Sequence, residues 1–382
     1  MFTSHPSRLR TPRGLLLGAG LATLALVLGA CASTPAATPS EEPSSPSEPS
    51  GDVIFDGEAT VGFAMYNGDV TRWYKYDIPN LEKHLAEYAP NVKLEAYDPK
   101  GNAAKQLQQV NAALVKGLDF LLLTPVEVTP SAILNAAKQS SVPVALYLNP
   151  PQDVPAENVV GLVGDGDLAV GKIQAEWALD TLSEGAQIGI ISGDLATVYA
   201  QRERQGVIEG LQSAIDDGTI DVVVDEGAVN FDPANAQKIA AAALVANPDI
   251  EAFIVANDDM SVGVINALEN VGKAGEVKVI GLDGLQSGLQ NMLRGKLTAT
   301  VARSFDDQAD AAAQIIAHTL AGQEPPVFDG TYSYKTPEIP FVNVPFHLVT
   351  LDNIELPIEF GNLTKEEVCD GLTPEEGGDF CS

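Results

Sequence analysis

The chain has 382 residues, of which 45% are hydrophobic and 6% aromatic, and its formal net charge at pH 7 is −30. This composition supports a packed core and excludes a largely disordered chain. So acidic a surface repels nucleic acids and anionic lipids, and three Cys and four His are too few for a protein built around zinc clusters. We therefore expect neither a nucleic-acid partner nor a metal site.

Residues 1–30 have the pattern of an export signal. Three arginines lie in the first 13 residues, and the apolar run that follows, residues 15–28, is shorter than the ~20 residues of a membrane-spanning helix. The run ends in Leu-Gly-Ala-Cys, which resembles the lipobox of bacterial lipoproteins. We expect cleavage before Cys31 and lipidation of its thiol. The alternative is an ordinary signal peptide that contains a Cys.

Residues 31–57 are rich in Ser, Thr, Pro and Glu, and such a segment buries too little apolar surface to fold. As a Pro-rich chain of ~3 Å per residue, it would form a tether of up to ~60 Å. A lipid at Cys31 followed by a tether places the folded part on the extracellular face of the cell membrane. Attachment would be through the lipid alone.

From residue 58 on, short apolar runs alternate with segments of helical periodicity. The expected strands of the first set are 61–66, 92–97, 120–123 and 142–148, and those of the second set are 187–191, 222–225, 253–256 and 277–282. Continuous apolar strands separated by helices indicate parallel sheets covered on both faces. The two sets predict an α/β protein with two Rossmann-like lobes.

Polar and aromatic side chains follow the ends of these strands, which is where open parallel sheets bind ligands. Asn, Asp and Arg make directional hydrogen bonds, and Trp and Phe offer flat apolar faces, so together they suit a polyol. For Asp69, Asp194, Asp258 and Asp259 the alternative is a turn residue or helix cap. The ligand-binding candidates are Arg72, Trp73, Asn149, Tyr199, Arg204, Phe231, Asn257, Asp283 and Arg303.

Residues 60 to about 355 resemble a type I periplasmic binding protein of a sugar ABC transporter, closest to the xylose-binding branch. The resemblance rests on Arg72-Trp73, on Asp-Pro-Lys-Gly-Asn at 98–102, on the segment 252–258 and on Gly-Leu-Asp-Gly at 281–284. It implies two lobes joined by a three-segment hinge. The expected N-terminal lobe comprises 58–163 and 304–338, and the expected C-terminal lobe comprises 164–303 and 339–360.

The resemblance also implies roles for individual residues. Arg72 and Trp73 would contact the sugar from the first lobe. Arg204, Asn257 and Asp283 would hold its hydroxyl groups from the second lobe. The lobes would close on the sugar, and the closed protein would deliver it to an ABC permease as a monomer.

Five positions differ from the family's pattern. Phe231 stands where the family has a stacking Trp, and Arg303 where it has a Lys near the hinge. The family's Asp-Arg pair is Leu148-Asn149 here, and Tyr199 replaces an Asn. Each lost charge-assisted contact is worth about 1.5–3 kcal/mol. The expected ligand is therefore sugar-like, either xylose-like or a modified glycoside.

Nothing in the sequence points to catalysis. His84, His318 and His347 adjoin no nucleophile motif, and neither a Walker A nor a dinucleotide-binding pattern occurs, so we expect neither an enzyme nor a cofactor. An exported hydrolase would need two carboxylates at ~5–9.5 Å across the cleft, for which Asp258 and Asp283 are the possible pair. A sensor that presents its closed form to a membrane receptor or kinase remains an alternative to transport.

The acidic tail, residues 361–382, contains Cys369 and Cys381. Once Cys31 is lipidated, these two are left to pair, and outside the membrane a disulfide is expected between them. The alternative is two free thiols on a frayed end.

Overall fold

The computed structural model describes residues 53–127, 130–152, 156–164 and 168–382, all within one unit, Pro49–Ser382. The expected signal peptide, Cys31 and most of the expected tether lie outside these residues. The last residues of the expected tether are already attached to the fold. Ile54 and Phe55 donate their backbone N–H groups to the carbonyl of Tyr88 at 2.9 and 3.0 Å.

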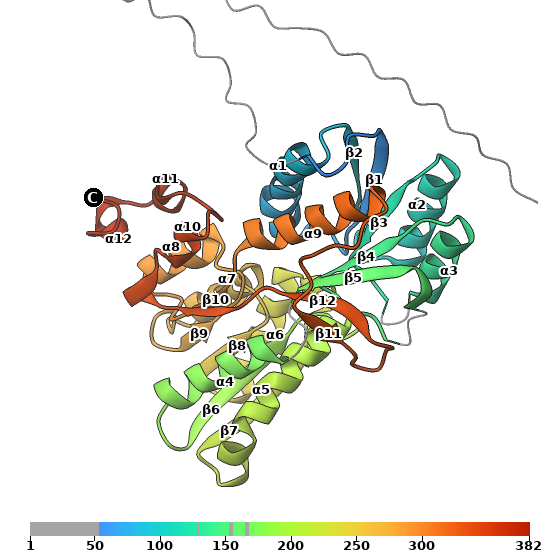
Figure 1. Ribbon diagram of the computed structural model, residues 1–382. Coiled ribbons are helices and arrows are strands. Elements are labelled where there is room, and N and C mark those ends of the chain that lie inside the picture. The colour runs from blue at the N-terminus through green and yellow to red at the C-terminus, as the bar shows by residue number, and fades with distance from the viewer. Residues whose placement is uncertain (1–52, 128–129, 153–155, 165–167) are drawn as a thin grey trace, which may run out of the picture. The chain divides into compact units, whose positions relative to one another are not determined.

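The first lobe is built on a seven-stranded sheet of order β11-β12-β5-β4-β3-β1-β2 (Figure 1). All neighbours pair in parallel except β11, which is antiparallel to β12. The strands are β1 (Ala59–Ala64), β2 (Val92–Tyr97), β3 (Phe120–Leu123), β4 (Val144–Tyr147), β5 (Val159–Gly164), β11 (Gly330–Tyr332) and β12 (Ile339–Asn343).

Helices cover both faces of this sheet because its strands are apolar on both sides. Phe63 of β1 packs with helices α1 (Ile78–Tyr88) and α9 (Phe305–Leu320), whereas Ala64 packs on the other face with α2 (Ala103–Val115) and α3 (Ser131–Gln139). A single turn of π-helix, η1 (Trp73–Asp77), precedes α1.

The second lobe has a four-stranded parallel sheet of order β7-β6-β8-β9, with β10 and β13 forming an antiparallel pair beside it. A bridge between Ile280 and Ala299 links the two sheets. The strands are β6 (Ala186–Ser192), β7 (Ile220–Gly227), β8 (Ile250–Val255), β9 (Lys278–Ile280), β10 (Thr300–Ala302) and β13 (His347–Val349). The helices are α4 (Ala169–Thr181), α5 (Val198–Asp216), α6 (Pro233–Ala246), α7 (Asp258–Asn270) and α8 (Gln286–Leu293).

The chain passes between the lobes three times: from β5 to α4, from β10 to α9, and from β12 to β13. The third passage lies further along the chain than expected, since the expected boundary between the lobes was at residues 338 and 339. That boundary falls inside the β11–β12 hairpin, because β12 pairs with β5 of the first lobe. The first lobe therefore extends to Asn343.

The C-terminal segment forms three short helices, α10 (Leu356–Glu359), α11 (Lys365–Cys369) and α12 (Pro374–Gly377), beside α8 (Figure 1). A disulfide joins Cys369 to Cys381. Leu363 and Val368 are buried in the core of the second lobe. The tail is therefore part of the folded body.

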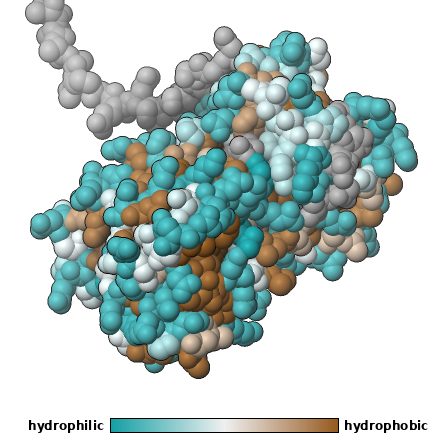
Figure 2. Space-filling model, turned by 90° about the horizontal axis from the view of Figure 1, so that it is seen from below, coloured by the Kyte–Doolittle hydropathy of each residue, from teal (hydrophilic) through white to brown (hydrophobic). Residues whose placement is uncertain are grey.

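The face drawn in Figure 2 is mostly hydrophilic, with hydrophobic residues gathered in a band near its centre. Among the described residues, no helix combines the length and the apolar character needed to cross a bilayer. Within the same ranges, no group of three or more His, Cys, Asp or Glu side chains is arranged to hold a metal ion.

Candidate functional site

A cavity lies where the carboxyl ends of strands from both lobes face each other. It encloses about 460 Å³ of empty volume, part of which is open to solvent. Each wall residue lies near the end of a strand or on a helix that follows one, as expected for parallel sheets. The lining residues are Tyr66, Val70, Arg72, Trp73, Leu148, Asn149, Tyr199, Phe231, Ala256, Asn257, Leu282, Asp283 and Arg303.

All the expected ligand-binding residues except Arg204 line this cavity. Arg204 lies on α5 and forms a fork-shaped ion pair with Asp225 of β7, so its guanidinium is used within the second lobe. The structure does not bring Arg204 to the cavity, where it was expected to hold a ligand hydroxyl. Sequence alone does not distinguish an arginine with a local acidic partner from one that faces a cavity.

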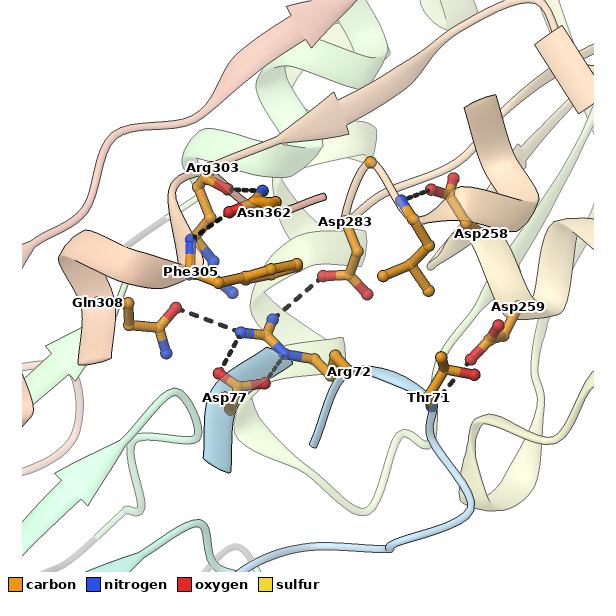
Figure 3. Close-up of polar contacts among 12 residues, drawn as sticks. Thr71, Arg72, Asp77, Asp258, Asp259, Asp283, Arg303, Phe305, Gln308 and Asn362 are labelled. Atoms are coloured by element: carbon orange, nitrogen blue, oxygen red, sulfur yellow. Dashed lines mark hydrogen bonds and ion pairs between the residues drawn. The ribbon is translucent and has the colours of Figure 1, made fainter. Parts of the chain in front are cut away.

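Arg72 is held almost entirely by the protein. Its Nε and Nη2 donate to the two oxygens of Asp77 at 2.8 and 2.9 Å, and its Nη1 donates to Asp283 Oδ1 at 3.1 Å. Nη2 also reaches Gln308 Oε1 at 3.3 Å, and the guanidinium lies over the ring of Phe305 (Figure 3). Arg72 is thus saturated by protein groups and has little left to donate.

The electrostatics of this network follow from burial. Burial alone would lower the pKa of Arg72, but Asp77 and Asp283 more than offset this, and its pKa lies above the usual range. Burial raises the pKa of Asp283, which Arg72 and Arg303 only partly counteract. Burial also raises the pKa of Tyr147, whose hydroxyl donates to Asp77 at 2.7 Å.

Arg303 presents the opposite situation. Its side chain is 1% exposed, and Nε, Nη1 and Nη2 all lack a hydrogen-bond partner among the described residues. The guanidinium lies over the ring of Phe346 at 4.4 Å, which supports its charge but satisfies no donor. A buried guanidinium with unsatisfied donors is costly, and here it lines a cavity. Arg303 is therefore the group best prepared to meet the oxygens of a ligand.

Other polar groups of the wall are partly used by the protein. Asn257 Oδ1 caps α7 by accepting the N–H of Met260 at 2.8 Å, and Asn149 Nδ2 donates to the carbonyl of Pro125 at 3.3 Å. The buried Trp73 Nε1 has no acceptor among the described residues. The buried side-chain donors without partners at the wall thus include the indole of Trp73 and the guanidinium of Arg303.

Hydrogen bonds between the lobes close the cavity. Tyr66 donates its hydroxyl to Asp194 Oδ2 at 2.8 Å, and the N–H of Thr71 donates to Asp259 Oδ2 at 3.1 Å. Burial, followed by the charge of Asp194, raises the pKa of Tyr66 above its usual range. Asp194 also accepts the N–H groups of Ala196 and Asn230, so it is both the turn residue considered above and a contact between lobes.

Three wall residues adopt a left-handed backbone that is uncommon for side chains of their kind. The φ angles of Leu148, Phe231 and Asp283 are 65°, 53° and 98°. Phe231 depends on Gly193, because a Cβ at residue 193 would lie 1.9 Å from the Phe231 ring. Backbone strain of this type collects at functional sites, where the surrounding structure maintains it.

The hydrolase alternative finds no support in this geometry. Asp258 is fully buried and does not line the cavity. Its oxygens accept from Thr300 Oγ1 and from the N–H of Leu285, both at 2.8 Å. Burial raises the pKa of Asp258 well above its usual value. Asp258 therefore does not face the cavity beside Asp283, as the acid and the carboxylate of a glycosidase would have to.

Two important residues were not among the candidates. Asp77 fixes Arg72 across the single turn of π-helix η1, and such a turn has no clear signal in the sequence. Tyr66 lies at the end of an apolar run, where it reads as a core residue. Its hydroxyl, however, reaches the other lobe.

The sequence profile described as "Periplasmic binding protein domain" matches residues 61–324. The chain belongs to this family. The family assignment confirms the expected fold and the expectation of a binding protein rather than an enzyme.

This periplasmic binding protein is similar in sequence to two curated relatives. It is 30% identical over 231 residues to the ribose import binding protein RbsB of Salmonella typhimurium, covering 60% of this chain and 75% of the relative. It is 28% identical over 270 residues to the D-xylose-binding periplasmic protein of Escherichia coli, covering 70% and 80%.

Solved structures agree on the fold. An ABC transporter solute binding protein from Clostridium phytofermentans with bound β-D-glucose superposes with a TM-score of 0.72 at 21% identity, covering 81% of this chain and 99% of that one. A carbohydrate transporter solute binding protein from Chloroflexus aurantiacus, in complex with D-glucose, gives 0.73 at 23% identity, covering 81% and 98%. At such identities the likeness describes the architecture of this periplasmic binding protein and not its ligand.

Proposed function

We propose that this periplasmic binding protein captures a sugar or sugar-like solute by closure of its two lobes and delivers it to an ABC importer. The observation that carries the proposal is the buried guanidinium of Arg303, which lines the cavity with all of its donors unpaired among the described residues. Its relatives are named for binding or importing ribose and xylose.

The residues of the cavity wall also limit which chemical groups the ligand can carry. Arg303 and Trp73 Nε1 require acceptor oxygens, which hydroxyl, ring or carbonyl oxygens of a sugar supply. Asp283 accepts from Arg72 through Oδ1, which leaves Oδ2 to accept from a hydroxyl. Leu148 offers no polar group where the resembling family has an Asp. We therefore propose a ligand that lacks a hydroxyl, or carries an apolar substituent, at the edge facing Leu148.

Isothermal titration calorimetry tests this proposal with matched pairs of sugars. The panel is D-xylose, D-glucose and D-ribose, each beside its deoxy and O-methyl derivatives, with myo-inositol as a cyclic polyol. We expect saturable binding by at least one member and a preference for a deoxy or methylated derivative. An Arg303→Met variant should lose binding. If no member binds, or if Arg303→Met binds as well as the wild type, the proposed site is wrong.

We further propose that the protein is a lipoprotein on the extracellular face of the membrane, because the segment before Cys31 resembles a lipobox and an apparent tether follows it. An acylated Cys with two or three chains anchors stably, whereas a single chain does so marginally. Fractionation of cells that express the full chain tests this proposal. The wild type should sediment with membranes and a Cys31→Ser variant should not; equal distribution of the two would refute lipid anchoring.

A further inference from the structure

Asn362, in the C-terminal tail, contacts the passage between β10 and α9 at the point where Arg303 leaves the second lobe. Its side chain is buried, with 5% of the residue exposed. Oδ1 accepts the backbone N–H of Phe305 at 2.8 Å, and Nδ2 donates to the backbone carbonyl of Arg303 at 2.7 Å (Figure 3). Because an N–H can only donate and a carbonyl can only accept, these two partners fix the orientation of the amide.

The two bonds satisfy backbone groups that have no partner in regular structure at this point. Ser304 is the N-cap of α9, with its Oγ accepting the N–H of Asp307 at 2.9 Å. The N–H of Phe305 is one of the donors that the first turn of a helix leaves unpaired. Asn362 supplies its acceptor from a segment 57 residues further along the chain.

Of the two residues held in this way, Arg303 carries one guanidinium of the cavity and Phe305 contacts the other, that of Arg72. Arg303 contributes its own side chain to the wall. The ring of Phe305 lies 4.5 Å from the guanidinium of Arg72 (Figure 3). The same ring stacks on that of Tyr76, with 5.2 Å between the ring centroids. A shift of the backbone at Arg303–Phe305 would therefore move both guanidinium groups.

The tail that carries Asn362 is itself firmly attached to α8. Gln290 Nε2 donates to the carbonyls of Val368 and Asp370 at 3.1 and 2.8 Å, and Arg294 pairs with Glu376 at 2.9 Å. The Cys369–Cys381 disulfide closes the segment beyond Asn362.

From these contacts we infer that Asn362 is a positioning residue of the ligand site, because its side-chain amide fixes the backbone of Arg303 and Phe305. The inference rests on the proposed function, since the position of Arg303 matters for affinity only if this cavity binds the solute. It assigns the tail a part in recognition although the tail does not line the cavity.

An Asn362→Asp variant isolates the contact to Arg303, because Asp keeps an acceptor for Phe305 but removes the donor to the Arg303 carbonyl. Gln290→Ala is the matched control, since it removes two other hydrogen bonds of the tail and leaves both contacts of the Asn362 amide in place. Crystal structures of both variants without ligand give a readout that needs no sugar. We expect the guanidinium of Arg303 to leave its place over Phe346 in Asn362→Asp and to keep it in Gln290→Ala. An unmoved guanidinium in Asn362→Asp would overturn the inference.

Calorimetry with D-xylose, D-glucose, D-ribose and myo-inositol gives the second readout. Asn362→Asp should weaken binding about tenfold, as expected when a buried hydrogen bond is lost, whereas Gln290→Ala should leave affinity unchanged. In an Arg303→Lys background, Asn362→Asp should weaken binding less, because the guanidinium that Asn362 positions is absent. An equal loss in both backgrounds would indicate a general effect on stability and contradict positioning. If the wild type binds no member of the full panel, deoxy and O-methyl derivatives included, the proposed function fails, and the crystallographic comparison still decides the inference.

Discussion

Arg72 of the first lobe and Asp283 of the second form an ion pair of 3.1 Å across the cleft, although they are 211 positions apart in the chain. Asp77 holds the same guanidinium from within the first lobe. Closure of the lobes therefore completes a charge network that one lobe alone leaves unfinished. The second guanidinium of the cavity, that of Arg303, has no such network, and this contrast leads to opposite predictions for the two arginines.

Replacing Arg303 by Met should stabilise the protein and abolish ligand binding. The change removes buried donors that have no partner among the described residues, which should raise the free energy of unfolding by roughly 1–3 kcal/mol. Urea unfolding and calorimetry on the same preparations would check both effects. A clear loss of stability would mean that the protein itself satisfies the guanidinium.

Replacing Arg72 by Met should have the opposite effect on stability. It leaves Asp77 and Asp283 buried without their cation, and breaking a buried ion pair in this way costs about 3–5 kcal/mol. An Arg72→Met/Asp77→Leu double variant removes both partners and should recover part of the loss. The same unfolding experiment measures it. If the double variant is as unstable as the sum of its single changes, the two residues are not coupled.

Tyr66→Phe should favour the open arrangement of the lobes in the absence of ligand. The variant loses the hydroxyl that bonds Asp194 across the cleft at 2.8 Å, a charge-assisted bond worth about 1.5–3 kcal/mol. Small-angle X-ray scattering should show a larger radius of gyration. Tyr88→Phe is the matched control, because its hydroxyl bonds Asp310 within the first lobe. The same change in both variants would argue against a contact that controls closure.

The free energy of unfolding of Asp258→Asn should increase relative to that of the wild type as the pH rises. Burial raises the pKa of Asp258, so the folded protein retains this proton at pH values where the unfolded chain has released it. Its contribution to stability is complete below about pH 4 and is lost as the pH rises through the folded pKa. Asn can donate to Thr300 Oγ1 and accept from the N–H of Leu285, and it does not titrate.

Urea unfolding at pH 4, 6 and 8 measures this trend. Asp217→Asn is the control of opposite sign, because hydrogen bonds from Thr219 lower the pKa of that exposed carboxyl. Its disadvantage relative to the wild type should be nearly complete at pH 4 and stay almost constant at pH 6 and 8, because this carboxyl ionises below pH 4 in the folded protein. A constant difference between Asp258→Asn and the wild type at all three pH values would show that Asp258 is ionised in the folded state.

Removing the Cys369–Cys381 disulfide should loosen the tail. Twelve positions separate the two residues, and closing a loop of about this size is worth ~3 kcal/mol. Hydrogen exchange of amides in α11 should speed up in a Cys369→Ala/Cys381→Ala variant, while β6 and β8 keep their protection. Intact mass after alkylation without reductant checks the premise. Labelling of both thiols in the wild type would show that the bond does not form in solution.

The alternation of apolar strands and helices predicted the two parallel sheets because burial on both faces leaves a continuous hydrophobic run in the sequence. It did not predict β5, whose glycines read as a loop. Gly161 is required for another reason: a Cβ there would lie 2.5 Å from the ring of Phe328. The need for that space comes from a segment far away in the chain, and no local pattern reveals it.

The residues of the site could be predicted from the sequence where they directly follow the end of a strand. Residues such as Asn257 and Asp283 lie where a parallel sheet presents them, so their position along the chain was sufficient. The partner of each charge was not predictable. Arg204 and Arg303 look alike in the sequence, and only the fold shows that one pairs with Asp225 while the other faces the cavity. Asn362 was missed because its role depends on backbone groups of another segment.

The left-handed backbone at Leu148, Phe231 and Asp283 restricts how this pocket could be redesigned as a biosensor. Valine, isoleucine and threonine fit poorly at such positions, so substitutions by these residues would destabilise the fold there. Val70, Tyr199 and Ala256 line the same cavity without that constraint. New specificities are therefore best sought at these three places.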